Sequence, residues 1–250
     1  MTTELGLPDT IQACLFDLDG VVTRTAVVHA AAWKEMFDAY LHARDGDSYR
    51  PFDPGHDYDE YVDGRPRADG VRTFLASRGI ELPEGTRDDP PEAETVHGLG
   101  NRKNVRLLEK IRTEGVEPYE SSLRYIAAAR ARGLRTAVVS SSANTRDVLR
   151  AIHAEELFDV RIDGVVAAER ELPGKPRPDT FLAAAADLGV EPSRAAVFED
   201  ALAGMDAGRS GRFGYVVGVD RVGQADALYA HGADIVVPDL ADLAGLEDRG

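Results

Sequence analysis

The chain contains one cysteine, Cys14, so no disulfide can form within it. Cys14 lies in an apolar run, and we expect it to pack as a small buried side chain rather than to act as a nucleophile. The sequence also lacks an apolar run long enough to span a membrane, and no apolar segment follows a basic start at the N-terminus. These absences favour a soluble, cytoplasmic protein whose fold does not depend on disulfides.

Positive charge is scarce. The 29 Lys and Arg residues are outnumbered by 44 Asp and Glu residues, which gives a net charge of −15. Because nucleic acids and anionic membrane surfaces bind basic patches, we expect neither as a partner. A few local Lys and Arg side chains are enough to bind a small phosphorylated substrate, so the net charge does not exclude one. No long apolar stretch calls for a second copy of the chain, and we expect a monomer.

Strand patterns are missing from residues 25–115. Helical spacing of apolar residues instead predicts helices at Ala26–Leu41, Arg67–Ser77 and Val96–Thr113. The segments 44–63 and 84–91 are rich in Gly, Pro and Asp, and we predict loops there, the first with room for one turn of helix. This part of the chain is therefore expected to consist of helices and loops, without strands.

Strands and helices alternate in the rest of the chain. Strands are predicted at 11–16, 134–139, 164–167, 195–198, 215–219 and 235–237. Helices are predicted at 122–132, 144–153, 179–188, 202–210 and 223–231. Such alternation is typical of a parallel sheet covered on both faces. We therefore predict an α/β fold with a doubly wound, Rossmann-like core domain (1–24 and 115–250) and an inserted α-helical cap domain (25–114).

Two aspartates follow the first predicted strand. Asp17 and Asp19 are two residues apart, so an extended backbone projects both to one side, and Gly20 lets the chain turn away. Neighbouring carboxylates repel each other and require a cation or a shared proton. The pair suits a magnesium-dependent site in which one carboxylate attacks and the other moves protons. A polar strand end followed by a turn explains the same residues without any chemistry.

Three later strand ends also carry polar residues. The segment Ser140–Asn144 offers hydroxyls and free N–H groups for phosphoryl oxygens, and it suits a helix N-cap equally well. Lys175, in a rigid Gly-Lys-Pro turn, suits a fixed positive charge beside a phosphate, although a solvated surface lysine is the commoner explanation. Glu199 and Asp200 offer the carboxylate oxygens that Mg²⁺ prefers, or they cap the next helix.

Taken in order, the D-x-D-G motif, the strand-end serine, the lysine and the acidic pair resemble the haloacid dehalogenase superfamily of phosphotransferases over essentially the whole chain. The resemblance implies that Asp17 is the nucleophile, which forms an aspartyl-phosphate, and that Asp19 is the general acid and base. It also implies that Ser140 holds the phosphoryl group and that Lys175 neutralises charge beside Asp17. Attack of one anion on another requires such neutralisation.

The cofactor implied by the resemblance is Mg²⁺. Its predicted ligands are Asp17, Glu199 and Asp200, together with the backbone carbonyl of Asp19. Carboxylate and carbonyl oxygens with a few waters are the ligands that this hard cation favours.

The predicted cap resembles that of the subfamily that contains β-phosphoglucomutase. The segment from Thr25 is similar to the subfamily's T-A-x-x-H-x-x-A-W motif, whose Thr lies at the hinge and whose His and Trp face the site. Arg67 matches a cap-loop arginine that grips a distal phosphate. The substrate-binding residues implied in this way are Thr25, His29, Trp33, Gly64, Arg67, Lys103, Asn104, Ser140, Ser141, Ser142, Asn144 and Lys175. Trp33 suits the core of the cap equally well.

Four features depart from the subfamily pattern. Arg24 stands where an acidic residue is frequent, Asp63 where a lysine is familiar, and Ser121 where glycine is usual. The segment 44–63 is longer than expected. Asp63 and this segment fall where the cap of the subfamily meets substrate, so the sugar is left open.

The resemblance implies a β-phosphoglucomutase-type isomerase that interconverts β-glucose 1-phosphate and glucose 6-phosphate through a phosphorylated enzyme and a bisphosphate. A mutase needs a second phosphate contact, matched here by Arg67, and a lid against water. One alternative is a sugar-phosphate phosphatase, a hydrolase on the same scaffold. Another is a regulator that binds a sugar phosphate without turnover, which is disfavoured because no catalytic position is substituted.

Overall fold

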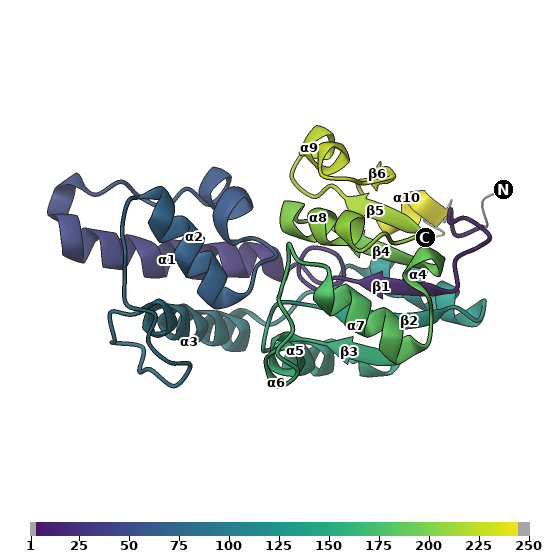
Figure 1. The fold of residues 1–250 in the computed structure, drawn as a ribbon, viewed down its shortest axis with the longest axis horizontal. Helices are drawn as coiled ribbons and strands as arrows, with labels where there is room; N and C mark the ends of the chain where they lie inside the picture. Colours follow the sequence, from purple (N-terminus) through teal and green to yellow (C-terminus); the bar gives the residue numbers. More distant parts are fainter. Residues whose placement is uncertain (1–3, 245–250) are drawn as a thin grey trace. The chain divides into compact units, whose positions relative to one another are not determined.

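The computed structural model of the protein describes residues 4–244, and it divides into two compact units (Figure 1). One unit comprises 1–24 and 117–250, and the other comprises 25–116. Gly115 and Val116 thus belong with the helical unit, two residues beyond the predicted boundary. The outermost parts of the predicted core domain, residues 1–3 and 245–250, lie outside the described residues.

A six-stranded, fully parallel sheet forms the centre of the α/β unit, with the strands in the order β3-β2-β1-β4-β5-β6. The strands are β1 (Ala13–Phe16), β2 (Arg135–Val139), β3 (Val160–Ile162), β4 (Ala195–Glu199), β5 (Tyr215–Val219) and β6 (Ile235–Val237). The order reverses direction on either side of β1. In doubly wound sheets this switch point, at the carboxyl ends of the strands, is where ligands bind.

Helices cover both faces of this sheet, as predicted (Figure 1). They are α4 (Glu120–Ala131), α5 (Thr145–Ala151), α6 (Gly164–Glu169), α7 (Asp179–Leu188), α8 (Leu202–Ser210), α9 (Ala225–Ala230) and α10 (Leu240–Ala244). Two short 3₁₀ helices, η3 (Glu155–Leu157) and η4 (Pro192–Arg194), precede strands β3 and β4. Among the described residues, no helix is both long and apolar enough to cross a membrane.

The side chains of β1 alternate between the two faces of the sheet and are buried on both. Ala13 and Leu15 join the apolar cluster under α7 and α8. Phe16 points the other way, where its ring stacks on Phe198 at 4.4 Å and meets Tyr125 of α4 edge-on. Cys14 is fully buried in the same strand. The apolar run read from the sequence is therefore a strand covered on both sides.

One predicted strand is wrong. Residues 164–167 form the start of α6, and the edge strand β3 lies just before them at Val160–Ile162. Asp163 explains the difference, because its carboxylate accepts hydrogen bonds from the backbone N–H groups of Val165 and Val166. This N-cap starts a helix in an apolar tetrapeptide that otherwise has the composition of a strand.

The helical unit consists of α1 (Thr25–Asp45), α2 (Arg67–Ser77) and α3 (Val96–Glu114), with a 3₁₀ turn, η1 (Gly46–Ser48), and one π-helical turn, η2 (Tyr58–Val62). Its core is aromatic. The Phe37 ring lies 4.1 Å from that of Phe74, 5.2 Å from that of Trp33 and 5.4 Å from that of Phe52. Buried aromatic rings supply large apolar area per residue, which suits a unit of this size.

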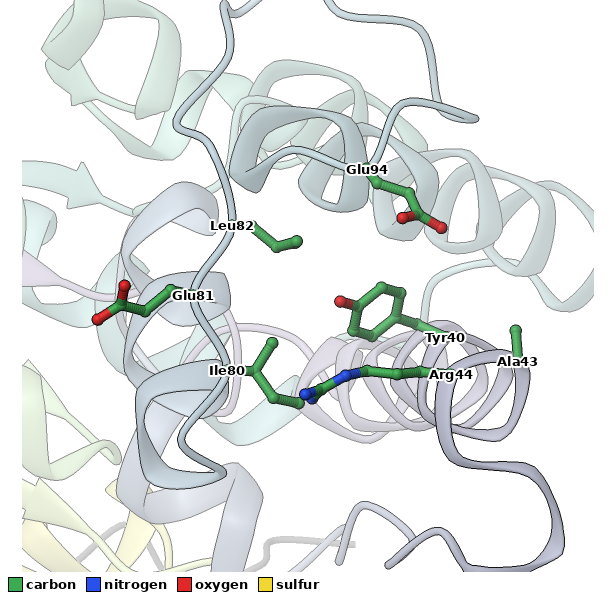
Figure 2. A pocket seen from close by; sticks show the side chains of 7 residues that line it. All are labelled: Tyr40, Ala43, Arg44, Ile80, Glu81, Leu82 and Glu94. Carbon is green, nitrogen blue, oxygen red and sulfur yellow. The ribbon is translucent and has the colours of Figure 1, made fainter.

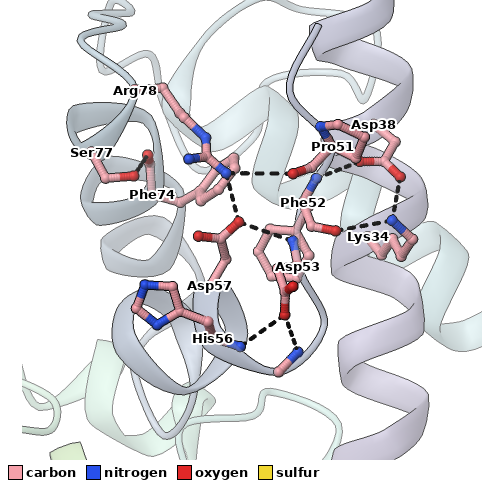
Figure 3. A network of polar contacts seen from close by, with 11 residues as sticks. Lys34, Asp38, Pro51, Phe52, Asp53, His56, Asp57, Phe74, Ser77 and Arg78 are labelled. Carbon is pink, nitrogen blue, oxygen red and sulfur yellow. Dashed lines mark hydrogen bonds and ion pairs between the residues drawn. The ribbon is translucent and has the colours of Figure 1, made fainter.

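The unexpectedly long segment 44–63 is folded into this unit (Figure 3). Phe52 is buried, and its backbone N–H donates to the Asp38 carboxylate on α1 at 2.7 Å. Asp57, also buried, accepts from Arg78 at 2.6 Å and from the Asp53 N–H at 2.9 Å. The segment is thus anchored by one apolar side chain and by a buried ion pair at the end of α2.

Candidate active site

The register of the sheet brings the predicted chemistry to one edge. Phe16 of β1 pairs with Val138 of β2 on one side and with Phe198 of β4 on the other. The residues that follow these three strands therefore leave the sheet at the same edge. These are the two aspartates after β1, the serine loop after β2 and the acidic pair at the end of β4, all of which the sequence singled out.

Lys175 joins these strand ends. Its Nζ donates to Asp17 Oδ1 at 2.5 Å, to Glu199 Oε1 at 2.5 Å and to the backbone carbonyl of Val139 at 3.1 Å. Lys175, Asp17 and Glu199 are 1%, 5% and 0% exposed. The lysine is therefore a buried, fully engaged cation, and the surface-turn explanation is wrong. The same Nζ lies 4.9 Å from the centre of the Phe181 ring on α7.

The electrostatics of the cluster are unbalanced. Burial raises the pKa of Asp17 well above its ordinary value, and the negative charges of Glu199 and Asp19 raise it further, although Lys175 opposes the shift. Burial alone would lower the pKa of Lys175, but its attraction to Asp17 and Glu199 more than offsets this and raises it. One ammonium thus serves several carboxylates, which leaves negative charge for a further cation to neutralise.

A second contact links the aspartate loop to the serine loop. Ser140 Oγ lies 3.4 Å from Asp19 Oδ2, and Ser140 is 2% exposed. The Ser140 hydroxyl also accepts the backbone N–H of Ser142, and the Ser142 hydroxyl accepts that of Asn144. These successive turns fix the loop before α5. Ser141, Ser142 and Asn144 are each partly exposed, so this loop, for which phosphate binding is predicted, is ordered by its own hydrogen bonds and remains accessible.

The buried carboxylates fit a divalent cation. Oxygens of Asp17, Glu199 and Asp200 lie within 4.8 Å of one another. Glu199, however, already accepts Lys175 through Oε1 and the N–H groups of Asp200 and Ala201 through Oε2. Asp17 and Asp200 are therefore the better placed carboxylate ligands, and Glu199 mainly orients the lysine. The Asp19 side chain is not one of the three carboxylates of this cluster, and metal binding by its backbone carbonyl stays a prediction.

Two glycines make room for the carboxylates. Gly20 has φ +93°, and a Cβ there would lie 1.7 Å from Asp200 Oδ2. A Cβ at Gly204 on α8 would lie 1.8 Å from Glu199 Oε1. No larger residue fits at either position without displacing a carboxylate. Gly20 was singled out by its place in the motif, whereas nothing in the sequence around Gly204 indicated its role.

The helical unit holds a second polar group of predicted residues. Lys103 Nζ lies 3.2 Å from His29 Nδ1 and 4.8 Å from the centre of the Trp33 ring. Lys103 and Trp33 are both 3% exposed, and Thr25, which begins α1, is 1% exposed. The Trp33 ring is part of the aromatic core of its unit, as the core explanation of this residue anticipated.

Arg67, at the start of α2, is fixed by a residue that sequence reasoning missed. Its Nη2 donates to Asn101 Oδ1 at 2.9 Å, and the Asn101 amide donates in turn to the carbonyls of Arg87 and Asp89. Burial lowers the pKa of Arg67. Predicted residues Gly64 and Asn104 are in the same unit, where Gly64 has φ +67° in the turn before α2. The sequence analysis named Lys103 and Asn104, which follow Asn101 closely in the chain, but not Asn101 itself.

A pocket of about 330 Å³ lies elsewhere in the helical unit (Figure 2). Its lining consists of Tyr40, Ala43, Arg44, Ile80, Glu81, Leu82 and Glu94. No predicted site residue contributes to it. We therefore place the candidate active site at the buried charged cluster and not at this pocket.

Comparisons with known proteins agree with this geometry. The sequence profile of haloacid dehalogenase-like hydrolases matches residues 11–212. A β-phosphoglucomutase from Mycobacterium tuberculosis is 56% identical over 245 residues, covering 96% of this chain and 94% of the relative. One from Bacillus subtilis is 33% identical over 236 residues, covering 93% and 92%. The crystal structure of β-phosphoglucomutase from Clostridium difficile, 27% identical, superposes with a TM-score of 0.70 and covers 93% of each chain.

These relationships settle the class of protein. The relatives support phosphotransferase activity, and enzymes of this superfamily generally need a divalent metal, which the acidic cluster suits. Since the family profile spans most of the chain and a relative aligns along nearly its whole length, the protein belongs to the haloacid dehalogenase superfamily and is an enzyme of its β-phosphoglucomutase-like branch.

Proposed function

We propose that this enzyme interconverts β-glucose 1-phosphate and glucose 6-phosphate through a phosphorylated Asp17 and a bisphosphate intermediate. The observation that carries the proposal is the buried Asp17–Lys175–Glu199 cluster beside Asp19 and Ser140. It combines a fixed nucleophile, a fixed cation and a second carboxylate in one small volume. The 56% identity to a β-phosphoglucomutase supports the choice of substrate.

Asp17 is the nucleophile in this proposal. Lys175 holds its Oδ1, so Oδ2 is the oxygen that attacks phosphorus. The bond between phosphorus and the sugar oxygen breaks, and the aspartyl-phosphate forms. Because both reactants are anions, the lysine lowers the barrier by neutralising charge that builds up between them. Its own position is fixed by Glu199 and the Val139 carbonyl, so little reorganisation is needed.

Asp19 moves the protons. It donates one to the departing sugar oxygen and later accepts one from the sugar hydroxyl that attacks the aspartyl-phosphate. Ser140, hydrogen-bonded to Asp19, is placed to hold a phosphoryl oxygen. The bisphosphate then binds in the opposite orientation, and Asp17 attacks its other phosphoryl group. The bond between that phosphorus and its sugar oxygen breaks, Asp19 gives the oxygen a proton, and the aspartyl-phosphate re-forms as the sugar monophosphate leaves. The same two groups therefore serve both half-reactions.

Mg²⁺ is the proposed cofactor. Asp17 and Asp200 would hold it through carboxylate oxygens, with the Asp19 backbone carbonyl as a further ligand and Glu199 close by. When bound, it neutralises phosphoryl and carboxylate charge and orients the phosphoryl group. The Gly20 turn, which gives the Asp200 carboxylate its space, supports this assignment.

The helical unit is proposed to supply the contact with the second phosphate. Arg67, fixed by Asn101, offers a preorganised guanidinium, which suits bidentate binding of phosphate. Thr25, His29, Lys103 and Asn104 are the further residues assigned to sugar binding. A phosphatase has no need of a second phosphate contact, so Arg67 is the residue that distinguishes the two functions.

The deciding experiment is an assay with Mg²⁺, β-glucose 1-phosphate and a trace of glucose 1,6-bisphosphate, in which glucose 6-phosphate and inorganic phosphate are followed together. We expect glucose 6-phosphate with little free phosphate. Free phosphate without glucose 6-phosphate would make the enzyme a phosphatase and overturn the proposal.

Arg67→Ala sharpens the assay. We expect it to lower the rate of glucose 6-phosphate formation about 100-fold, because removal of one partner of a charge-assisted phosphate contact costs about 3 kcal/mol. Arg87→Ala is the matched control, since the Arg87 side chain is exposed and only its carbonyl meets Asn101. Equal losses in both variants would remove Arg67 from the proposed role.

A further inference from the structure

Arg221, in the loop after β5, makes contacts that bring together three segments far apart in the sequence. Its Nε donates to the Gly20 carbonyl at 2.9 Å, and its Nη1 donates to the Pro238 carbonyl at 2.8 Å and to Asp239 Oδ2 at 3.2 Å. Its guanidinium carbon lies 3.6 Å from the centre of the Tyr119 ring. The side chain is only 14% exposed. An arginine buried to this extent is held by specific contacts rather than by solvent.

The first segment held is the turn that carries Asp19. The Gly20 N–H donates to the Thr23 carbonyl at 2.7 Å, and the Thr23 N–H and hydroxyl both donate to the Leu18 carbonyl. These bonds satisfy the inner groups of the turn. The Gly20 carbonyl accepts its hydrogen bond from outside the turn, from Arg221 Nε. The Gly20–Val21 peptide, one residue beyond Asp19 in the same turn, is therefore bonded to a side chain 201 residues further along the chain.

The second segment is where the chain returns from the helical part. The Tyr119 N–H donates to the Val22 carbonyl at 2.9 Å, and the Arg24 N–H donates to the Glu117 carbonyl at 2.9 Å. The Tyr119 ring also meets Arg24, whose guanidinium carbon lies 4.7 Å from the ring centre. Arg24 is one of the departures from the subfamily pattern, and here it contacts the same ring as Arg221.

The third segment follows β6. Asp239 accepts from Arg221 and from the Ser121 hydroxyl at 2.7 Å. Ser121, another departure from the subfamily pattern, thereby ties the start of α4 to the same carboxylate. The guanidinium and the Asp239 carboxylate together form a polar bridge between the aspartate turn and the segment 117–121.

We propose that Arg221 is a positioning residue for phosphoryl transfer: by holding the Gly20 carbonyl while packing on Tyr119, it fixes the turn that carries Asp19 to the segment where the chain enters α4. This rests on the proposed role of Asp19 as general acid and base, but not on the choice between mutase and phosphatase. A planar, five-donor guanidinium can meet two carbonyls, a carboxylate and a ring face at once, whereas an ammonium cannot.

The test compares Arg221→Met and Arg221→Lys with wild type, using p-nitrophenyl phosphate hydrolysis and the β-glucose 1-phosphate assay, both with Mg²⁺ and well below the measured Tm of each variant. We expect Arg221→Met to lower kcat about 10- to 100-fold with KM changed less than about 3-fold, since an ill-oriented proton donor affects the transition state more than binding. We expect Arg221→Lys to recover less than a third of the loss on a logarithmic scale.

Amide hydrogen exchange provides a readout that does not depend on turnover. Arg221→Met should speed exchange at residues 18–23 and 117–121. Arg170→Met is the control, because Arg170 forms an exposed ion pair with Asp187, and it should change neither exchange nor kcat. Wild-type kcat in Arg221→Met, full recovery in Arg221→Lys, or faster exchange confined to residues 219–224 and 238–242 would each overturn the proposal. If wild type hydrolyses p-nitrophenyl phosphate but makes no glucose 6-phosphate, the proposed function fails while this test remains valid.

Discussion

The two units use buried charge in opposite ways. In the α/β unit, one lysine meets the carboxylates of Asp17 and Glu199, and Asp19 and Asp200 lie nearby, so negative charge is in excess. In the helical unit, Asp57 and Arg78 form a buried pair in which charge is balanced one to one. Burying charge without a partner is costly, so a persistent excess indicates a site prepared for a cation and an anionic substrate. A balanced pair indicates a structural role.

The largest expected effect is that of removing the carboxylate of Asp17, the proposed nucleophile. Asp17→Asn should lower phosphoryl transfer at least about 1000-fold, because an amide cannot replace the nucleophile. Since it also relieves like-charge repulsion around Lys175, we expect the free energy of unfolding to stay level or to rise. Activity assays and urea denaturation of the same preparations measure both quantities.

Asp187→Asn, on an exposed ion pair, is the control for Asp17→Asn. If Asp17→Asn lowered the free energy of unfolding by more than about 1 kcal/mol, Asp17 would be a structural partner of Lys175, as Asp57 is of Arg78. The two units would then not differ in their use of buried charge.

The balanced pair of the helical unit should behave in the reverse manner. Arg78→Met leaves the buried Asp57 without its cation and should cost about 3 kcal/mol of stability. Arg72, on the α2 helix that Arg78 follows, pairs with Glu84 at 2.6 Å but is 43% exposed, so Arg72→Met should cost about 1 kcal/mol or less. Differential scanning calorimetry measures the Tm of both variants. Equal Tm shifts would argue that the buried pair stabilises the protein no more than the exposed pair does.

A single methyl group should disturb the unbalanced cluster. Gly204→Ala places a Cβ where the Glu199 carboxylate lies, so we expect Lys175 to shift and kcat to fall about 100-fold. Gly208→Ala on the same helix meets only Val216 and Val197 methyl groups at 3.3–3.5 Å and should leave kcat within about 2-fold. Both substitutions raise the helix propensity of α8. An equal fall of kcat in both variants would therefore mean that a change in α8, and not the displaced Glu199 carboxylate, is responsible.

The smallest expected effect is on the pH dependence of stability, and it involves Asp159 and its hydrogen-bond donors at the surface of the α/β unit. Burial would raise the pKa of Asp159, but hydrogen bonds from the Thr136 N–H and from Arg130, with a further one from Arg135, lower it overall. A lowered folded-state pKa stabilises the protein above the unfolded value of about 3.9 and ceases to do so as pH falls through the folded value. Asp159→Asn should therefore cost about 1 kcal/mol at pH 7 and much less at pH 3, as urea titrations at the two values would measure. A cost independent of pH would mean that hydrogen bonds rather than charge are responsible.

Much of the fold follows from local pattern. The helices at 67–77, 179–188 and 202–210 and the strands at 215–219 and 235–237 have the predicted limits, because periodicity and flanking Gly or Pro define them. The error at 164–167 arose because one side chain, Asp163, decides between strand and helix in an apolar tetrapeptide. The short helix α10 was not predicted.

The site divides in the same way. Asp17, Asp19, Ser140, Glu199 and Asp200 could be named because each lies in a motif at a strand end. Lys175 was named from its Gly-Lys-Pro turn, but the structure places this turn between α6 and α7 and not at a strand end as predicted. Asn101 and Arg221 could not, since their contacts reach 34 and 201 residues along the chain. Gly204 was equally hidden, because its role is the space that it leaves for another residue. Sequence pattern reveals the groups proposed to do chemistry, whereas the residues that contact and space them emerge only from packing.

The burial of Cys14 in β1 has a practical consequence. Burial raises the pKa of this thiol and leaves it 0% exposed, so thiol-reactive reagents should not reach it in the folded protein. We therefore expect fluorescent maleimides not to label the native enzyme, so Cys14 need not be replaced before new cysteines are introduced. Cysteines introduced at Val27 and Val222, which are 76% and 68% exposed and belong to different units, would accept a donor–acceptor dye pair. Energy transfer between the dyes would then follow the separation of the two units, molecule by molecule, during turnover.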